Sequence, residues 1–220
     1  MPLDDIISVM NRILSRIYPN DVYEGFTPLP ESLTGWGGNA LIFSQLVDVI
    51  RPRVIVEVGS WKGQSAVTMA EACQRHRLDC AIICVDTWLG SEEHILNFGK
   101  DLRPQHGFPT IYYQFLSNVV HRGVQEIIVP FPTTSLSAAA VLKSLGIKAD
   151  LIYIDANHQF DAVLADLKAF VPLLAGNGIM FGHDHRWDSV REALQEHCNR
   201  TRCGYRTEGD FWILNSPQTA

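Results

Sequence analysis

Short apolar runs alternate with segments of helical periodicity along most of the chain. Turn-forming residues bound each run, and the runs cover residues 54–58, 81–86, 126–131, 151–155 and 178–182. Strands that alternate with helices predict a parallel sheet with right-handed crossovers and helices on both of its faces.

The two ends of the chain depart from this alternation. Apolar residues from Ile6 to Ile17 recur at helical spacing and predict an amphipathic helix that packs on the domain or on a partner subunit of a homodimer. A second helix is predicted over residues 40–50. Near the C-terminus, segments 205–208 and 211–215 flank Gly209-Asp210 and predict a β-hairpin.

The helix predicted after the fourth strand has one apolar face that runs from Phe160 to Leu174. Asp161, Asp166 and Lys168 fall outside this face, so we expect all three side chains to point toward solvent. Between the second and third strands, residues 88–123 form an insertion rich in aromatic residues, which is predicted to shape a substrate pocket.

Composition limits the possible functions. The chain has 220 residues, of which 46% are hydrophobic and 19% are charged, so a single domain with a full core is expected. The net charge is −6 and the basic residues are scattered, which excludes an electrostatic nucleic-acid surface and favours a small-molecule substrate.

The cysteines and the N-terminus indicate the cellular compartment of the protein. The five cysteines form no C-x-x-C pair and have no metal-ligand spacing, which is typical of free thiols in a reducing cytosol. The N-terminus lacks a secretory pattern and no apolar run is long enough to span a bilayer, so a cytoplasmic protein without membrane contact is expected.

The segment from Val54 to Ser65 carries the clearest ligand-binding signal. A buried strand runs into Glu57, then Gly59, Ser60, Trp61 and Gly63, and a helix begins near Gln64 or Ser65. The two glycines permit a sharp turn and close approach of the backbone to a ligand. The spacing E-x-G-x-x-x-G differs from the G-x-G-x-x-G fingerprint of dinucleotide-binding proteins.

This segment resembles the first motif of class I S-adenosylmethionine-dependent methyltransferases. The resemblance implies a Rossmann-like, doubly wound α/β fold with a seven-stranded, mostly parallel sheet and a reversed C-terminal strand. Residues 1–220 would form one methyltransferase domain, in which residues 1–50 supply helices and a cofactor-covering loop. Residues 53–215 would form the core.

The resemblance also implies where the cofactor binds. Asp86 closes the second strand and matches the acidic residue that holds the ribose, whereas Glu57 and the backbone near Gly59 lie by the methionine part. The remaining implied cofactor residues follow the strand ends: Ser60, Trp61, Gly63, Ser65, Thr87, Trp88, Thr134, Ser135 and Asp155. Helix capping is the alternative role for Asp86, Thr134 and Ser135.

Residues with acid-base chemistry follow the fourth and fifth strands, namely Asp155 and His158, then His183 and Asp184. Oxygen ligands suit Mg²⁺, and imidazole admits Zn, Fe or Ni. These segments resemble metal-dependent small-molecule O-methyltransferases of the macrocin and novobiocin type, with Asp155, His183 and Asp184 at the metal positions. The relatives have an acidic residue where His183 stands, and several sugar methyltransferases have an acidic residue at Asn157.

The sequence therefore predicts a methyltransferase that acts on a hydroxyl of a small molecule with divalent-metal assistance and with His158 or His183 as general base. Two alternatives remain open. One is metal-free methylation of another heteroatom, or a relative of cephalosporin-biosynthetic proteins. The other is a non-catalytic module that binds S-adenosylmethionine.

Overall fold

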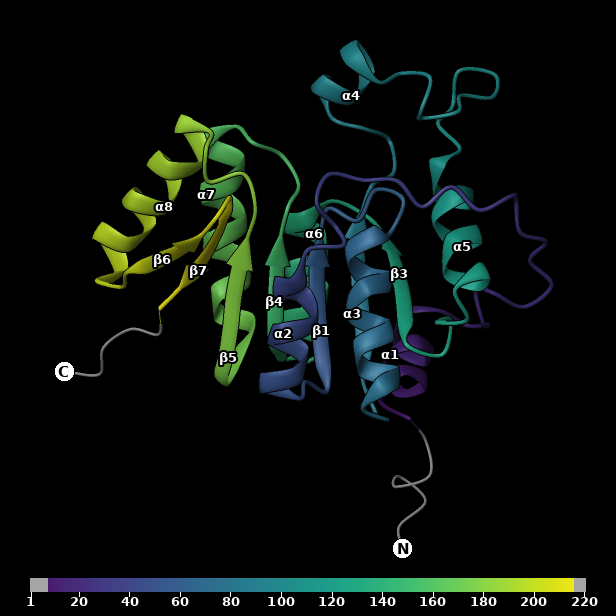
Figure 1. Cartoon of the computed structure of the whole chain (residues 1–220), viewed down its shortest axis with the longest axis horizontal. Helices are drawn as coiled ribbons and strands as arrows, with labels where there is room; N and C mark the ends of the chain where they lie inside the picture. Colours follow the sequence, from purple (N-terminus) through teal and green to yellow (C-terminus); the bar gives the residue numbers. More distant parts are fainter. Residues whose placement is uncertain (1–7, 216–220) are drawn as a thin grey trace, which may run out of the picture.

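A computed structural model describes residues 8–215, in which seven strands form one sheet in the order β3-β2-β1-β4-β5-β7-β6 (Figure 1). Strands β1 to β5 pair in parallel, and β7 runs antiparallel to both β5 and β6. The expected doubly wound sheet with a reversed C-terminal strand is confirmed. The strands are β1 (Val54–Val58), β2 (Ala81–Asp86), β3 (Ile128–Pro132), β4 (Ala149–Ile154), β5 (Leu174–Gly182), β6 (Tyr205–Glu208) and β7 (Phe211–Leu214).

Helices cover both faces of the sheet. One core layer lies under α2 (Leu41–Ile50), α3 (Gln64–Arg75) and α5 (Ile111–His121), which are in front of the sheet in Figure 1. The opposite layer lies under α1 (Val9–Ile17), α6 (Ser135–Ser144), α7 (Phe160–Phe170) and α8 (Asp188–Thr201). Side chains of β1 alternate between these layers, since Ile55 belongs to the first and Val56 to the second.

Helix α1 packs on its own chain. Val9, Met10, Ile13 and Leu14 are buried in the layer that α6 and α7 share. The backbone N–H of Val9 also donates to Asp79 Oδ1 over 2.8 Å. Residues 6 and 7 of the predicted helix lie outside the described residues. Among residues 8–215, no helix has the length and apolar character needed to cross a membrane.

The end of α7 differs from the prediction. The helix stops at Phe170, a short 3₁₀ turn covers Val171–Leu173, and β5 begins at Leu174 instead of near residue 178. Pro172 explains the difference, because proline has no N–H to continue the α-helical hydrogen bonds. The apolar residues after it belong to the turn and the strand.

The expected exposure of Asp166 is wrong, since this residue is only 4% exposed. Helix α7 packs against α6 on one side and α8 on the other, so more than one stripe of its surface is covered. Burial raises the pKa of Asp166 to about 6, although the side chain of Ser135 opposes the shift by hydrogen bonding.

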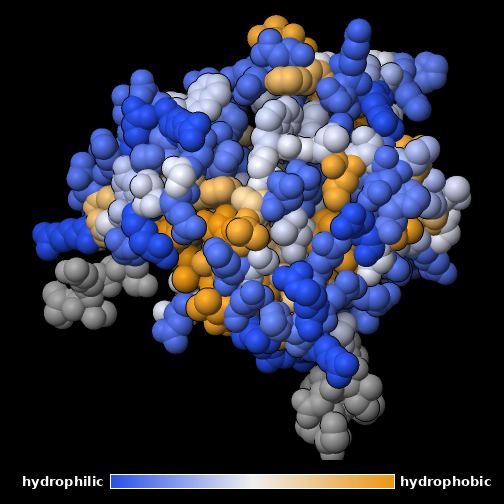
Figure 2. Space-filling model, viewed as in Figure 1, coloured by the Kyte–Doolittle hydropathy of each residue, from blue (hydrophilic) through white to orange (hydrophobic). Residues whose placement is uncertain are grey.

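The insertion after β2 has two parts with different environments. Helix α4 (Glu92–Asn97) has no buried residue and projects above the sheet, whereas α5 returns to the core with Phe115 fully buried (Figure 1). Figure 2 shows apolar atoms at the tip of this projection as well as over the lower centre of this face, and Ile95 and Leu96 of α4 are exposed. The part around α4 lies above the strand ends and is available to cover a ligand.

Candidate active site

A cavity of about 610 Å³ opens at the carboxyl ends of the parallel strands. Loops after all five parallel strands line it, as expected for ligand sites of open parallel sheets. The loop 34–38 and helix α4 line its outer side. The lining includes ten of the predicted cofactor residues: Gly59, Ser60, Trp61, Ser65, Asp86, Thr87, Trp88, Thr134, Ser135 and Asp155, together with His158, His183 and Asp184.

Two glycines shape the loop between β1 and α3. Gly59 has φ +90° and Gly63 has φ +87°, conformations that strain other residues. A Cβ on Gly59 would lie 1.9 Å from the carbonyl oxygen of Asp155, and one on Gly63 would lie 2.9 Å from the ring of Phe115. Gly59 therefore allows the loop after β1 to touch the loop after β4. This contact places the acid-base residues after β4 beside the loop that matches the cofactor motif.

The carboxylate of Asp86 organises the loop at its floor. Its Oδ2 accepts hydrogen bonds of 2.9 Å from the backbone N–H groups of Ser60 and Trp61, and its Oδ1 accepts one of 2.8 Å from Trp88. A carboxylate offers roughly four acceptor positions, so about one remains for a ligand hydroxyl. Trp61 and Trp88, whose N–H groups donate to Asp86, adopt positive φ angles of 48° and 52°.

Glu57 lies beneath the cavity and does not line it. Its Oε1 accepts a 2.6 Å hydrogen bond from Ser65 Oγ, and burial raises its pKa to about 7. The Ser60 side chain lies close enough to Glu57 to oppose this shift, although neither Glu57 Oε2 nor Ser60 Oγ has a well-formed hydrogen bond among the described residues. Ser60 lines the cavity, so its hydroxyl is available to a bound ligand.

The other predicted cofactor residues combine structural and lining roles. Thr134 is the N-cap of α6, where its Oγ1 accepts from the N–H of Ser137 over 3.3 Å. Trp88 is almost fully buried and donates from Nε1 to the carbonyl of Trp61 over 2.7 Å. Thr87 Oγ1 accepts from the N–H of Leu89. Each side chain thus holds its own loop while it contributes to the cavity wall.

A cluster of carboxylates and imidazoles lies at the ends of β4 and β5. Asp184 contacts two imidazoles, with its Oδ2 2.8 Å from His158 Nε2 and its Oδ1 3.3 Å from His183 Nδ1. Asp155 Oδ2 accepts a 2.7 Å hydrogen bond from the hydroxyl of Tyr153. The expected convergence of Asp155, His158, His183 and Asp184 on one place is therefore observed.

The two carboxylates of this cluster have pKa shifts in opposite directions. Burial and the nearby charge of Asp184 raise the pKa of Asp155 to about 7. For Asp184, hydrogen bonds with His158 and His183 outweigh burial and hold its pKa well below the usual range. The same hydrogen bonds overcome burial at both imidazoles and raise their pKa. One carboxylate is thus firmly ionised, and its neighbour titrates near neutral pH.

The cluster divides into two groups of possible metal ligands that share Asp184. Asp155, His158 and Asp184 form one group, and His183, Asp184 and Asp210 form the other, with ligand atoms within 4.8 Å of one another in each. The predicted set of Asp155, His183 and Asp184 is distributed over both groups. Two carboxylates with one imidazole fit a divalent cation that accepts both oxygen and nitrogen ligands.

Sequence reasoning did not find Asp210, Glu93 or Trp187 as site residues. Asp210 is in the turn before β7, and antiparallel pairing of β7 with β5 brings this turn beside Asp184. The predicted hairpin and reversed strand could have indicated that Asp210 lies near Asp184. Glu93 Oε2 lies 3.5 Å from His158 Nδ1, and Trp187 stacks on the His158 ring with centroids 5.0 Å apart. No sequence pattern indicated these last two contacts.

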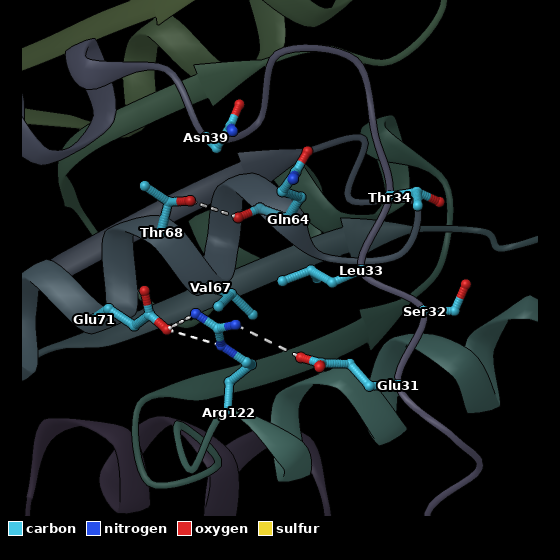
Figure 3. A pocket seen from close by; sticks show the side chains of 10 residues that line it. All are labelled: Glu31, Ser32, Leu33, Thr34, Asn39, Gln64, Val67, Thr68, Glu71 and Arg122. Carbon is cyan, nitrogen blue, oxygen red and sulfur yellow. Dashed lines mark hydrogen bonds and ion pairs between the residues drawn. The ribbon is translucent and has the colours of Figure 1, made fainter.

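A second cavity, of about 700 Å³, lies on the other side of the loop 31–39, between that loop and α3 (Figure 3). Its charged side chains are already paired. Arg122 hydrogen-bonds to Glu71 Oε1 over 2.9 Å from Nε and lies 3.7 Å from Glu31 Oε1. It has no imidazole and does not open at the strand ends, so the first cavity is the candidate active site.

Comparison with known proteins agrees with this location. Residues 56–185 match a protein family described as a methyltransferase domain. The uncharacterized protein y4gI of Sinorhizobium fredii is 26% identical over 139 residues, which are 63% of this chain but only 14% of that protein. This chain thus spans a small part of that relative's length.

Solved O-methyltransferases share the fold at low sequence identity. The O-methyltransferase from Bacillus cereus in complex with SAH is 13% identical, with a TM-score of 0.58 and coverage of 96% of this chain and 93% of that one. The O-methyltransferase NovP is 15% identical, with a TM-score of 0.61 and coverage of 82% and 80%.

The family match covers more than half of the 220 residues and includes the glycine loop, Asp86, Asp155 and Asp184. The chain therefore belongs to this methyltransferase family. The expected resemblance to class I methyltransferases is confirmed in family and in fold.

Proposed function

We propose that the protein transfers the methyl group of S-adenosylmethionine to a hydroxyl oxygen of a small molecule. The observation that supports this most directly is the backbone contact between Gly59 and Asp155, because it places the acid-base cluster next to the cofactor loop. Asp86 and the backbone of residues 59–61 hold the nucleoside, and the segment 88–98 with the loop 34–38 encloses the acceptor.

In the proposed reaction the acceptor oxygen attacks the methyl carbon as the carbon–sulfur bond breaks, which yields a methyl ether and S-adenosylhomocysteine. The hydroxyl proton passes to the imidazole of His158, which Asp184 orients through the 2.8 Å contact at Nε2. His183, on the other oxygen of Asp184, is the second candidate base. Most of the acceleration would come from holding oxygen and methyl group in line.

We propose that Asp155 and Asp184 hold a divalent cation with His158 as third ligand. In this version His183 takes the hydroxyl proton, because an imidazole bound to a cation is a poor base. Such a cation lowers the pKa of a bound hydroxyl and fixes its oxygen. The donor set fits because the two carboxylates belong to one group with His158, and because Asp155 and Asp184 repel each other in the absence of a cation.

Calorimetric titration with S-adenosylhomocysteine tests the cofactor site. We expect Asp86→Ala to weaken binding at least about 100-fold, since three backbone N–H groups lose a charged acceptor. Asp188→Ala is the matched control, because Asp188 is on the exposed start of α8 and pairs with Arg191. Absence of binding to the unmodified protein would remove the proposal.

Titration with Mn²⁺ in the presence of S-adenosylhomocysteine tests the cation independently of turnover. We expect saturable binding to the unmodified protein and loss of it in Asp155→Asn. Methyl transfer is then assayed as S-adenosylhomocysteine release on a broad panel of hydroxylated acceptors, with His158→Gln and His183→Gln to identify the base. Cofactor binding without transfer to any acceptor would favour a non-catalytic module.

One observation favours a metal-free version of the same reaction. Both oxygens of Asp184 already contact imidazoles, an arrangement that orients a general base without a cation. Unchanged turnover after treatment with EDTA, together with no Mn²⁺ binding, would select this version.

A further inference from the structure

Carboxylates dominate the charged groups that line the active-site cavity. Among the lining residues in the described part of the chain there are five carboxylates and three imidazoles, but no Lys and no Arg. The carboxylates are Asp86, Glu93, Asp155, Asp184 and Asp210. A cavity of this kind opposes anionic ligands and favours cations.

Two imidazoles, those of His158 and His183, are paired with Asp184, and the other basic side chains nearby do not neutralise the remaining carboxylates. The ammonium group of Lys62 is buried below the cavity wall, where it pairs with Asp101 over 3.0 Å and lies over the Trp61 ring at 5.7 Å from the centroid. Arg186 Nε lies 3.8 Å from Asp210, but its side chain is 79% exposed, so solvent screens the pair. The carboxylates that line the cavity therefore place a negative potential where the ligand binds.

The proposed function uses three of the five carboxylates. Asp86 binds the loop N–H groups, and Asp155 with Asp184 belongs to the proposed cation site. Glu93 and Asp210 are left without such a role. Glu93 approaches His158 Nδ1 from α4, whereas Asp210 lies beyond His183 on the hairpin turn. Both carboxylates line the cavity, Glu93 beside His158 and Asp210 beside His183 and Asp184.

Aromatic rings form another part of the cavity wall. Trp36 from the loop 34–38 lies with its ring centroid 5.3 Å from Phe98 and 5.7 Å from Trp61, and Trp61 stacks on His94 at 4.3 Å. Trp36 is 53% exposed despite its size, so it presents a free ring surface. Burial lowers the pKa of His94, which keeps this ring uncharged at neutral pH. Such faces attract organic cations.

We infer that the acceptor is a cationic ring compound that carries both the hydroxyl to be methylated and an amino group. Its ring packs on the aromatic wall of Trp36, Trp61, His94 and Phe98, and its ammonium group lies near Glu93. Acceptors with phosphate or carboxylate groups are disfavoured, because no Lys or Arg lines the cavity to receive them. This inference rests on the proposed function and specifies its substrate.

Two series of probes that differ only in charge test the inference. One consists of dopamine, 4-ethylcatechol and 3,4-dihydroxyphenylacetate, and the other of glucosamine, glucose and glucuronate. Binding to the protein saturated with S-adenosylhomocysteine is followed by calorimetry and by tryptophan fluorescence. We expect the amine to bind about tenfold more tightly than the acid in at least one series, with the neutral compound between them.

Matched variants locate the effect. Glu93→Gln should reduce the preference for the amine severalfold, while Glu92→Gln should not, because Glu92 contacts Gln159 and does not line the cavity. Trp36→Leu should weaken binding of the amine. Phe108→Leu changes an exposed ring of the insertion 88–123 that does not line the cavity, so it should have no effect.

Three results would overturn the inference. They are equal or tighter binding of the acid in both series, an amine preference that persists in both Glu93→Gln and Trp36→Leu, and no binding of either amine. In each case intact binding of S-adenosylhomocysteine would leave the proposed methyl-transfer function in place. Loss of that binding would instead reject the proposed function.

Discussion

Substitution of Gly59 by alanine should damage both stability and cofactor binding. The added Cβ would lie 1.9 Å from the Asp155 carbonyl oxygen, and ordinary contact begins at 3.4 Å, so the two backbones must separate by about 1.5 Å. The φ angle of +90° adds strain that only glycine avoids. Forced overpacking costs about 1–3 kcal/mol and the left-handed conformation about 1–2 kcal/mol, which together predict about 2–5 kcal/mol of lost stability.

The same displacement moves the cofactor loop relative to the acid-base cluster. A misplacement of about 1 Å near reacting groups can lower the rate about 100-fold. We therefore expect Gly59→Ala to weaken S-adenosylhomocysteine binding and to reduce turnover of any acceptor by at least this factor. Urea unfolding and calorimetry measure the two effects separately.

Gly107→Ala provides the control for conformational strain. Gly107 has φ +83°, close to that of Gly59, but a Cβ added there would meet no atom of the described residues within 4 Å. The free energy of unfolding of Gly107→Ala should fall only by the cost of the left-handed conformation, about 1–2 kcal/mol, and cofactor binding should be retained. If Gly59→Ala behaves like Gly107→Ala in both assays, the backbone contact does not constrain the site and the reasoning is wrong.

Three further predictions follow from individual contacts. Asp166→Asn should stabilise the protein at pH 8 by up to about 3 kcal/mol and have little effect below pH 4. The folded-state pKa of about 6 exceeds the ordinary 3.8, so ionisation of Asp166 lowers the stability of the unmodified protein as the pH rises between these two values. Equal urea midpoints for the two proteins at pH 8 would refute this. Tyr153→Phe removes the hydrogen bond that lowers the pKa of Asp155, so less of this carboxylate is ionised at pH 7. The affinity for Mn²⁺, measured by calorimetry at pH 7, should therefore fall about tenfold. An unchanged affinity would show that the Tyr153 hydroxyl is dispensable. Lys62→Met should accelerate hydrogen exchange around Thr34 and Asp101, since its ammonium group holds both side chains, and unaltered protection would count against that tether.

The sheet and the cofactor loop could be predicted because their signals are local. Five apolar runs marked the parallel strands, and the glycines on either side of Trp61 marked the turn. Asp86 was placed correctly at the strand end. Its hydrogen bonds to backbone N–H groups could not be predicted, because they depend on the positive φ angles of Trp61 and Trp88.

Residues that join the site from a distance were harder to predict. Glu93 approaches His158 only because α4 projects back over the strand ends, and residues 65 apart in sequence give no periodic signal. Asp166 shows the opposite failure. Helical periodicity identified one apolar stripe of α7, but a helix between two neighbours buries its flanks as well.

The C-terminal hairpin connects the end of the described chain to the site. The turn after β1 is held by Asp86 and the N–H groups of residues 60, 61 and 88, all from the first half of the chain. His183 is held from the other half, because Trp212 packs on Gly182 and its Nε1 donates to the His183 carbonyl over 3.0 Å. A proteolytic cut before residue 210 would therefore separate Asp210 and the support of His183 from the fragment that carries the turn after β1.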